Sequence, residues 1–384
     1  MKPGAKWCIS MQTSNKYWKR YRKDFFFFFW FENDENLGND RKIAICVSKD
    51  NWEIAEVYGG ADNEIEMELA LPSYIIKAIE NEKSIYEKKR IERIDIVKSK
   101  LKLNPQTNRY DYDGDLDRDI LKTFFLSEDK DWFTISFGEI TGDFDCSRLG
   151  IKSLKRAPQK VGGSFDCSSN QLTSLEGAPK KVGESFDCSN NELSSLEGAP
   201  KKISLDFLCS YNDISSLEGA PQTVEGDFKC FWNKLTSLKG APKEVGGDFY
   251  CFKNQLTSLE GAPQTIGGNF DCHRNQLISL EGAPQEIGGD FICSNNYLTS
   301  LEGAPQKGVR DFWCDNNQLT SLEGAPQKVD RRFYCTDNQL TSLEGAPQEI
   351  GGDFNCRRNP NLHSLDGIGE VRGDMYKDFK TYDI

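Results

Sequence analysis

Cysteine recurs every 21 residues, and its thiol could form disulfides, bind a metal or attack as a nucleophile. A phenylalanine stands two residues before each member of the series, which is Cys146, Cys167, Cys188, Cys209, Cys230, Cys251, Cys272, Cys293, Cys314, Cys335 and Cys356. Stacked copies would lie about 5 Å apart, within disulfide reach, but equivalent neighbours cannot all pair. We therefore expect buried free thiols in a reducing compartment. Metal binding is disfavoured because there is no CxxC motif and histidine occurs only at His273 and His363.

Acidic residues also recur at fixed places in the period and could collect cations such as calcium. The aspartates of one set are Asp143, Asp206, Asp227, Asp248, Asp290, Asp311 and Asp353. The glutamates of the other are Glu176, Glu197, Glu218, Glu260, Glu281, Glu302, Glu323 and Glu344. We favour structural roles, in which the aspartates accept hydrogen bonds from turn amides and the glutamates are solvated. The segment from Asp111 to Asp115 is similar to a calcium loop, but Lys122 stands where the loop requires glutamate.

Cys8 is a candidate nucleophile outside the repeats. Residues 1–138 contain no histidine that could activate it, although a lysine or aspartate could take that role. We predict that the protein is not an enzyme and uses no cofactor. The N-terminal part is where an activity would have to lie if this prediction were wrong.

The elements that hold these side chains follow from the period itself, which is typical of a short-repeat solenoid. In residues 161–181, Phe165 and Cys167 alternate with polar residues, which predicts a short strand with one buried face. Asn170 recurs in later repeats, with Leu149 in its place in the first, and we expect it to bond backbone groups of its own and the adjacent repeat. Leu172 closes the core. The return side is too short for a full helix, so we expect extended or one-turn helical segments there.

The Phe-x-Cys-x-x-Asn-x-Leu pattern of residues 165–172 matches the consensus L-x-L-x-x-N-x-L, so the array resembles leucine-rich repeats. The Thr-Ser-Leu-Glu-Gly-Ala-Pro that follows is similar to the short repeats of bacterial effector proteins. The resemblance implies a parallel sheet of about 11 repeats over residues 139–384. Residues 373–376 predict a twelfth strand that lacks the cysteine and caps the array.

The residues beside each cysteine vary, and the resemblance places them on the concave face. The middle repeats gather Tyr211, Lys229, Phe231, Trp232, Tyr250, Phe252, Lys253, His273 and Arg274. A second group nearer the C-terminus comprises Arg310, Trp313, Arg331, Arg332, Tyr334, Arg357 and Arg358. Trp, Tyr and Arg dominate binding hot spots, so we predict partner-binding residues here, with neutral drift of surface positions as the alternative. The aspartates nearby and the net charge of −12 disfavour nucleic acid.

Residues 1–138 carry no repeat and are predicted to form a separate α+β domain. We expect strands at residues 25–31, 42–47 and 52–58, followed by an amphipathic helix from Ser73 to about Leu103. The residues on or near one face of this helix are Ile75, Ile76, Ile79, Ile91 and Ile94. The opening Ala-Lys-Trp-Cys-Ile-Ser of residues 5–10, with the aromatic residues of 17–21, resembles a segment of uncharacterised bacteriophage and large-virus proteins. This resemblance implies a phage or viral origin and no known reaction.

The apolar run at residues 25–31 is far shorter than the roughly 20 residues of a membrane span, and no secretory signal is visible, so we expect no membrane contact. We predict a cytoplasmic protein of the producing or infected cell, with a place in the virion left open. The predicted function is a non-enzymatic protein–protein interaction module that binds a host or viral protein through its concave face. Self-association through the N-terminal domain is left open. The alternatives are an N-terminal enzyme with the solenoid as substrate reader, and a virion or scaffold component.

Overall fold

The structure is a computed structural model that describes residues 25–32, 41–48, 54–58, 73–127, 129 and 131–379. The chain forms two compact units, Met1–Ser99 and Lys100–Ile384. Cys8 and the segment that resembles viral proteins lie outside the described residues.

The described residues of the first unit form an antiparallel sheet and a helix. Strands β1 (Phe25–Glu32), β2 (Arg41–Ser48) and β3 (Ile54–Tyr58) pair in the order β1-β2-β3. Helix α2 spans Ser73–Lys100, so the predicted strands and helix are present. Ile79 and Ile94 are buried but Ile91 is 57% exposed, because it lies about 120° around the helix from Ile79. In the part of the chain that the structure describes, no helix is both long enough and apolar enough to cross a bilayer.

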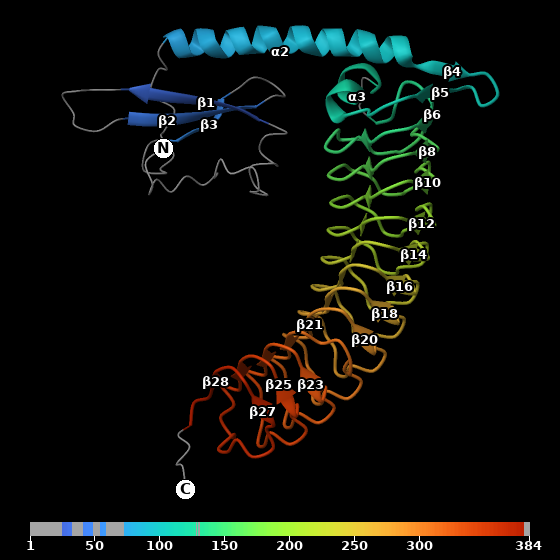
Figure 1. Ribbon diagram of the computed structural model, residues 1–384. Helices are drawn as coiled ribbons and strands as arrows, with labels where there is room; N and C mark the ends of the chain where they lie inside the picture. The colour runs from blue at the N-terminus through green and yellow to red at the C-terminus, as the bar shows by residue number, and fades with distance from the viewer. Residues whose placement is uncertain are drawn as a thin grey trace. The chain divides into compact units, whose positions relative to one another are not determined.

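The second unit is a solenoid whose coils stack from β6 to β28, as Figure 1 shows. Each coil adds one two-residue strand to a parallel sheet of twelve strands, ordered β28-β26-β24-β22-β21-β19-β17-β15-β13-β11-β9-β7. These strands are β7 (Phe144–Asp145), β9 (Phe165–Asp166), β11 (Phe186–Asp187), β13 (Phe207–Leu208), β15 (Phe228–Lys229), β17 (Phe249–Tyr250), β19 (Phe270–Asp271), β21 (Phe291–Ile292), β22 (Phe312–Trp313), β24 (Phe333–Tyr334), β26 (Phe354–Asn355) and β28 (Met375–Tyr376). This confirms the predicted leucine-rich-repeat-like solenoid and its twelfth, cysteine-free strand.

The return side of each coil is extended, as expected for so short a repeat. Its two-residue strands pair in parallel within three sheets. These strands are β8 (Lys160–Val161), β10 (Lys181–Val182), β12 (Lys202–Ile203), β14 (Thr223–Val224), β16 (Glu244–Val245), β18 (Thr265–Ile266), β20 (Glu286–Ile287), β23 (Lys328–Val329), β25 (Glu349–Ile350) and β27 (Glu370–Val371). One sheet runs from β12 to β20 and another from β23 to β27. The break between them falls at Gly308, where the buried apolar residue of the strand moves one place along the chain, to Val309.

The core between the two sides is a set of ladders of identical side chains. The repeat phenylalanines are fully buried and stack, for example Phe228, Phe249 and Phe270 with ring centroids 5.2 and 5.6 Å apart. The asparagines three residues after the repeat cysteines form a second ladder, and they bond backbone groups of adjacent coils as predicted. The Asn254 amide donates to the Cys230 and Cys251 carbonyls at 3.1 and 3.0 Å and accepts from the Leu235 amide at 3.1 Å. Each coil is thereby bonded to the coil before it.

The solenoid begins earlier in the chain than the predicted boundary at residue 138. Strands β4 (Lys102–Asn104), β5 (Arg109–Tyr112) and β6 (Phe137–Ile140) continue the return-side sheet in the order β10-β8-β6-β5-β4. Leu116, fully buried, bridges to Phe144 as a preceding repeat would, and helix α3 (Arg118–Phe124) follows it. Residues 100–138 therefore form an irregular first coil, which the sequence hides because it lacks the 21-residue period.

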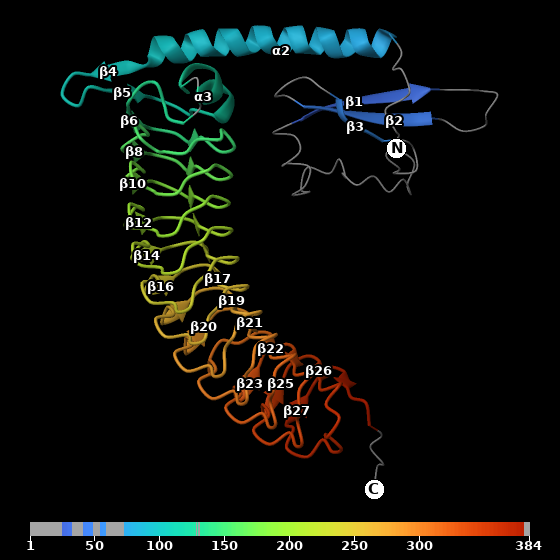
Figure 2. The ribbon, with the colours of Figure 1, turned by 180° about the vertical axis from the view of Figure 1, so that it is seen from behind.

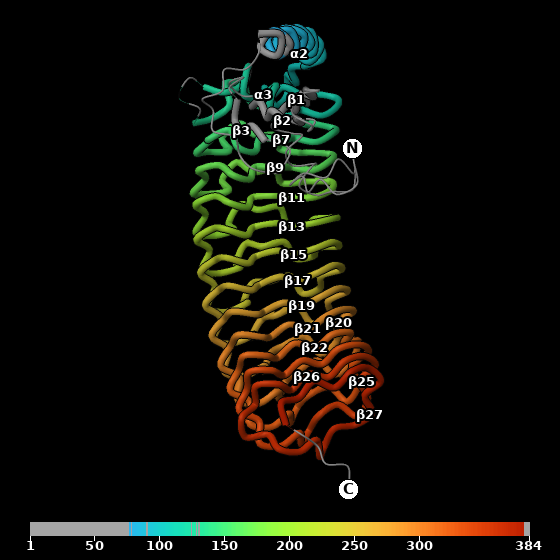
Figure 3. The backbone as a smooth tube through the Cα atoms, turned by 90° about the vertical axis from the view of Figure 1, so that its left-hand side faces the viewer, coloured from blue at the N-terminus to red at the C-terminus, as the bar shows by residue number. Residues whose placement is uncertain are grey.

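The second unit curves along its length. Figure 2 shows the coils bending toward the side that carries β17, β19, β21, β22 and β26, so the twelve-stranded sheet lines the concave face and the return strands line the convex face. Figure 3 shows the concave sheet face-on, with its strands in sequence order.

Candidate partner-binding face

The repeat cysteines offer no accessible chemistry. All eleven are buried and free. Burial raises the pKa of each thiol, to about 11 for Cys356 and well above the ordinary value for Cys167, so no reactive thiolate forms near neutral pH. These cysteines pack as small apolar residues, as the spacing predicts.

The acidic ladders are structural as well. The Asp206, Asp227 and Asp248 carboxylates each accept the backbone N–H of the equivalent residue in the next coil, at 2.8 Å in every case. The recurring glutamates are all exposed. Asp111 and Asp115 accept amides of the following coil at 2.7 and 2.9 Å, so the segment similar to a calcium loop is part of the same ladder. Among residues 73–379, as far as they are described, no cluster of acidic, histidine or cysteine side chains could hold a metal ion.

Three positions of each repeat present variable side chains on the concave face. The strand position lies between the phenylalanine and the cysteine, the post-cysteine position directly follows the cysteine, and the left-handed position comes one residue later. The left-handed position takes its name from its backbone, since φ lies between 52° and 58° in all eleven repeats. The sequence prediction placed most of the binding residues at these positions, whereas Arg310, Arg331 and Arg332 precede the strands of their coils. The structure brings the predicted residues of the middle repeats together.

The post-cysteine position carries a closed aromatic stack in the middle repeats. Phe231 and Phe252 lie 4.4 Å apart with rings 8° from parallel, and Phe252 and His273 lie 4.6 Å apart at 17°. The His273 Nδ1 atom lies 2.7 Å from the Asp271 carboxylate, which orients the imidazole. Both faces of the central Phe252 ring are therefore covered, and a partner can reach only its edges.

The left-handed position continues this surface with two more rings and two cations. Tyr211 and Trp232 stack at 5.7 Å and 16°, and both remain about half exposed. The Lys253 ammonium lies 4.1 Å from the centroid of Trp232, a cation–π contact. Arg274 follows at the same position of the next coil and is exposed. We call Tyr211, Trp232, Lys253 and Arg274 the exposed row.

The strand position contributes groups that are already paired. The Lys229 ammonium lies 2.9 Å from the Asp227 carboxylate and 5.5 Å from the Tyr250 ring. The Tyr250 hydroxyl donates to Asp248 at 2.7 Å, and burial together with this bond raises the pKa of Tyr250 to about 12. The Lys229 ammonium and the Tyr250 hydroxyl are therefore already paired within the protein and are less available to bind a partner.

The C-terminal group of predicted residues is also brought together, but most of its cations are neutralised. Trp313 and Tyr334 are in ring contact at 5.0 Å, with Arg332 over Trp313 at 5.6 Å. Arg332 donates to the buried Asp311 at 2.7 Å, and Arg331 lies 4.0 Å from the same carboxylate.

Around that core, Arg358 pairs with Asp337 at 2.9 Å, and Arg357 lies over the Tyr376 ring at 5.1 Å. Arg310 is exposed. The coil of Cys293, with Ser294 and Asn295, separates this group from the middle one.

The backbone at the exposed row is strained for the residues that occupy it. Positive φ suits asparagine, which stands at this position in Asn190, Asn295 and Asn316, whereas other side chains cost about 1–2 kcal/mol each there. The asparagines also bond one another, as Asn316 does to Asn295 at 2.6 Å. Four successive coils give up both advantages and carry Tyr, Trp, Lys and Arg at this position.

Replacing Arg274 by asparagine should therefore stabilise the protein. We expect Arg274→Asn to raise the free energy of unfolding by about 1 kcal/mol, because it relieves the strain and places an amide beside Asn295. Urea denaturation would measure the change, with the reverse substitution Asn295→Arg as the matched control that should lower stability by a similar amount. A loss of stability in Arg274→Asn would show that the arginine has a structural role.

An acidic patch that was not predicted from the sequence lies near the start of the concave face. Asp145, Asp166 and Asp187 occupy the strand position of three successive coils and pair in register on parallel strands. Partial burial and repulsion from Asp187 and Asp145 raise the pKa of Asp166 to about 6, and burial raises that of Asp187 as well. The sequence does indicate this patch, because aspartate recurs at the strand position of three consecutive repeats.

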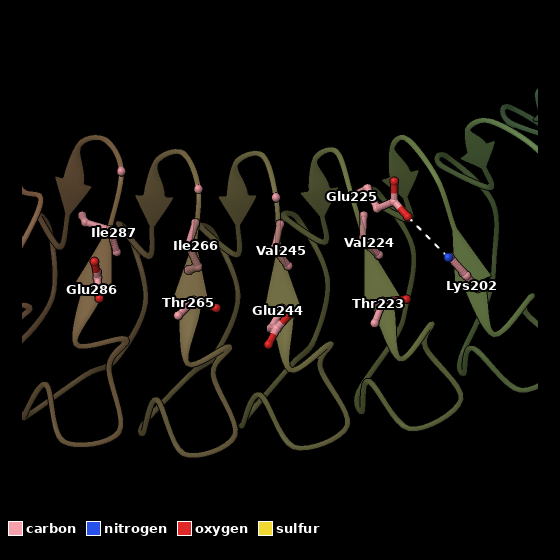
Figure 4. Close-up of a pocket in the computed structure, with 13 residues that line it drawn as sticks. Lys202, Thr223, Val224, Glu225, Glu244, Val245, Thr265, Ile266, Glu286 and Ile287 are labelled. Atoms are coloured by element: carbon pink, nitrogen blue, oxygen red, sulfur yellow. Dashed lines mark ion pairs between the residues drawn. The ribbon is translucent and has the colours of Figure 1, made fainter.

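The convex face has a shallow groove along β12 to β20, shown in Figure 4. Its floor contains Val245, Ile266 and Ile287, while Glu244 and Glu286 border it and Lys202 pairs with Glu225 at 3.4 Å. The groove has no aromatic side chain in its lining, and the valine and isoleucine side chains belong to the core. It is a less suitable binding surface than the concave face.

The comparisons with known proteins concern the fold alone. No protein-family model matches the chain, and no curated protein matches its sequence. Among solved structures, it is similar to YopM from Yersinia enterocolitica WA-314, with a TM-score of 0.43 and 22% sequence identity. The similarity covers 64% of this chain and 63% of that one, so the chain spans less than two thirds of that protein. The leucine-rich-repeat character follows from the chain's own Phe, Cys, Asn and Leu positions.

Proposed function

We propose that this protein is a non-enzymatic interaction module that binds a host or viral protein through the concave face of its solenoid. The exposed row carries the proposal, because Tyr211 and Trp232 keep about half of their surface in contact with solvent at a strained backbone position. Large aromatic side chains held this way are the anchors that dominate protein interfaces. The closed stack of Phe231, Phe252 and His273 beside them gives a rigid apolar border.

The chemistry of the face favours binding over catalysis. The repeat cysteines are buried in the core, and the carboxylates of the aspartate ladder accept hydrogen bonds from backbone amides. A phage or viral origin, a cytoplasmic location and self-association through residues 1–138 remain predictions from the sequence. An activity of the N-terminal part and a virion or scaffold role remain alternatives that we do not favour.

Affinity capture from lysate of the producing or host cell tests the proposal. We expect the intact chain to retain a specific protein that a Tyr211→Asn/Trp232→Asn variant loses, with a weakening of about 30-fold or more when both anchors are removed. Asparagine is chosen because it suits the positive φ, so the variant should fold. Ser169→Asn, at the same position two coils earlier, is the matched control and should bind normally. Equal retention by both variants would exclude the concave aromatic residues as the binding site.

A further inference from the structure

The two cations of the exposed row differ from three other basic residues of the concave face. Lys229, Arg332 and Arg358 each contact a carboxylate within 3 Å, at 2.9, 2.7 and 2.9 Å. For Lys253 and Arg274, no ion pair with any described residue is present, and the Lys253 ammonium lies 4.1 Å from the centroid of the Trp232 ring. In a chain with a net charge of −12, two adjacent unneutralised cations on a binding surface are an exception.

The aromatic stack beside these cations has the same electrostatic preference. Aromatic rings carry negative partial charge on their faces and positive partial charge at their edges. Because Phe252 is covered on both faces, at 4.4 Å by Phe231 and at 4.6 Å by His273, its accessible part is the positive edge. A negatively charged group of a partner is therefore attracted by the Phe252 ring edge, by the Lys253 ammonium and by the Arg274 guanidinium.

We infer that the partner presents an acidic segment, with closely spaced Asp or Glu carboxylates beside an apolar side chain. This inference rests on the proposed function and specifies the partner of the same site. The carboxylates bind Lys253 and Arg274, and the apolar side chain packs on Trp232 and Tyr211. Arginine suits this task because its guanidinium binds a carboxylate through two hydrogen bonds at once.

Nucleic acid fits the same surface less well, although it is also anionic. Proteins that bind single strands stack bases on open aromatic faces, whereas rings 4.4 Å apart leave no space for a base between them. A phosphate backbone also carries charge at every nucleotide, and the same coils carry Asp227 and Asp248. A peptide can place its carboxylates on the two cations and neutral residues elsewhere.

A random-peptide display selection on the full chain tests the inference. A parallel selection uses Lys253→Glu/Arg274→Glu, and a control uses Lys180→Glu/Lys243→Glu, which makes the same change in net charge at two exposed lysines elsewhere in the repeat. We expect peptides enriched in Asp and Glu next to an apolar residue from the intact chain and the control. These peptides should bind the charge-reversed variant at least 100-fold more weakly, about tenfold for each charged contact.

The outcomes separate the inference from the proposed function. Peptides without acidic residues that still require Tyr211 and Trp232 would overturn the acidic partner and leave concave-face binding intact. Peptides indifferent to Tyr211, Trp232, Lys253 and Arg274 would contradict both, as would the absence of any enriched sequence. Displacement of the acidic peptides by single-stranded DNA at equal concentration would also overturn the inference in favour of nucleic acid.

Discussion

Asn296→Ala is expected to lower the free energy of unfolding by about 3 kcal/mol. The Asn296 amide donates to the carbonyls of Cys272 and Cys293 at 3.2 and 3.0 Å, and its oxygen accepts the Leu277 N–H at 3.1 Å. Each carbonyl keeps a second asparagine donor, from Asn275 and Asn317, but the buried Leu277 amide loses its acceptor. An unsatisfied buried N–H and the lost amide bonds to the Cys272, Cys293 and Ser294 carbonyls account for the expected loss.

The adjacent residue supplies a control of the same type. Asn295 is partly exposed at the left-handed position, so Asn295→Gly keeps an allowed backbone and should cost less than about 1 kcal/mol. Chemical denaturation of the intact chain would compare the two variants. If both lost the same amount, the ladder would not be what ties one coil to the next.

Asp166→Asn is expected to stabilise the protein at about pH 8 by roughly 3 kcal/mol and to have little effect near pH 4. The pKa of Asp166 is about 6 in the folded chain, because partial burial and the carboxylates of Asp187 and Asp145 disfavour its charge. It is lower when the chain is unfolded, about 3.9. The folded state therefore binds an extra proton between these values, and stability falls as the pH rises through that window. Asparagine removes this loss while its oxygen still accepts the Ser168 N–H.

The control for this prediction exchanges the same residue types elsewhere on the solenoid. Asp206→Asn should be close to neutral at both pH values, because Asn269 already occupies the equivalent place and accepts the same backbone bond at 2.7 Å. Thermal unfolding across the pH range would measure both variants. A pH dependence of stability that Asp166→Asn leaves unchanged would contradict the assignment to this acidic patch.

The repetitive part of the fold could be predicted because each core position is repeated in every coil. Phe165, Cys167, Asn170 and Leu172 set the strand, the ladder and the core, and later coils copy them. The irregular first coil could not be found this way, since Leu116 and Phe137 fill core positions without the period. The start of the solenoid is determined by how residues 100–138 pack against the first regular repeat, and no local sequence pattern marks it.

The residues of the candidate site could be identified from the sequence, but which of their charges are paired could not. The variable positions identified Tyr211, Trp232 and Lys253, because residue type stands out in an otherwise uniform array. Which cations remain unneutralised depends on contacts between coils, such as Arg332 with Asp311, that a sequence does not display. The left-handed backbone at Trp232 was also hidden, since only the asparagines at the equivalent position indicate it.

The most direct test of concave-face binding is a calorimetric titration of the captured partner against three forms of the full chain. These are the intact chain, Tyr211→Asn/Trp232→Asn and Ser169→Asn. Our account predicts equal dissociation constants for the intact chain and Ser169→Asn, and a value about 30-fold or more higher for the double variant, which should be folded. Equal affinity for all three forms would contradict the account and place the binding site elsewhere in the chain.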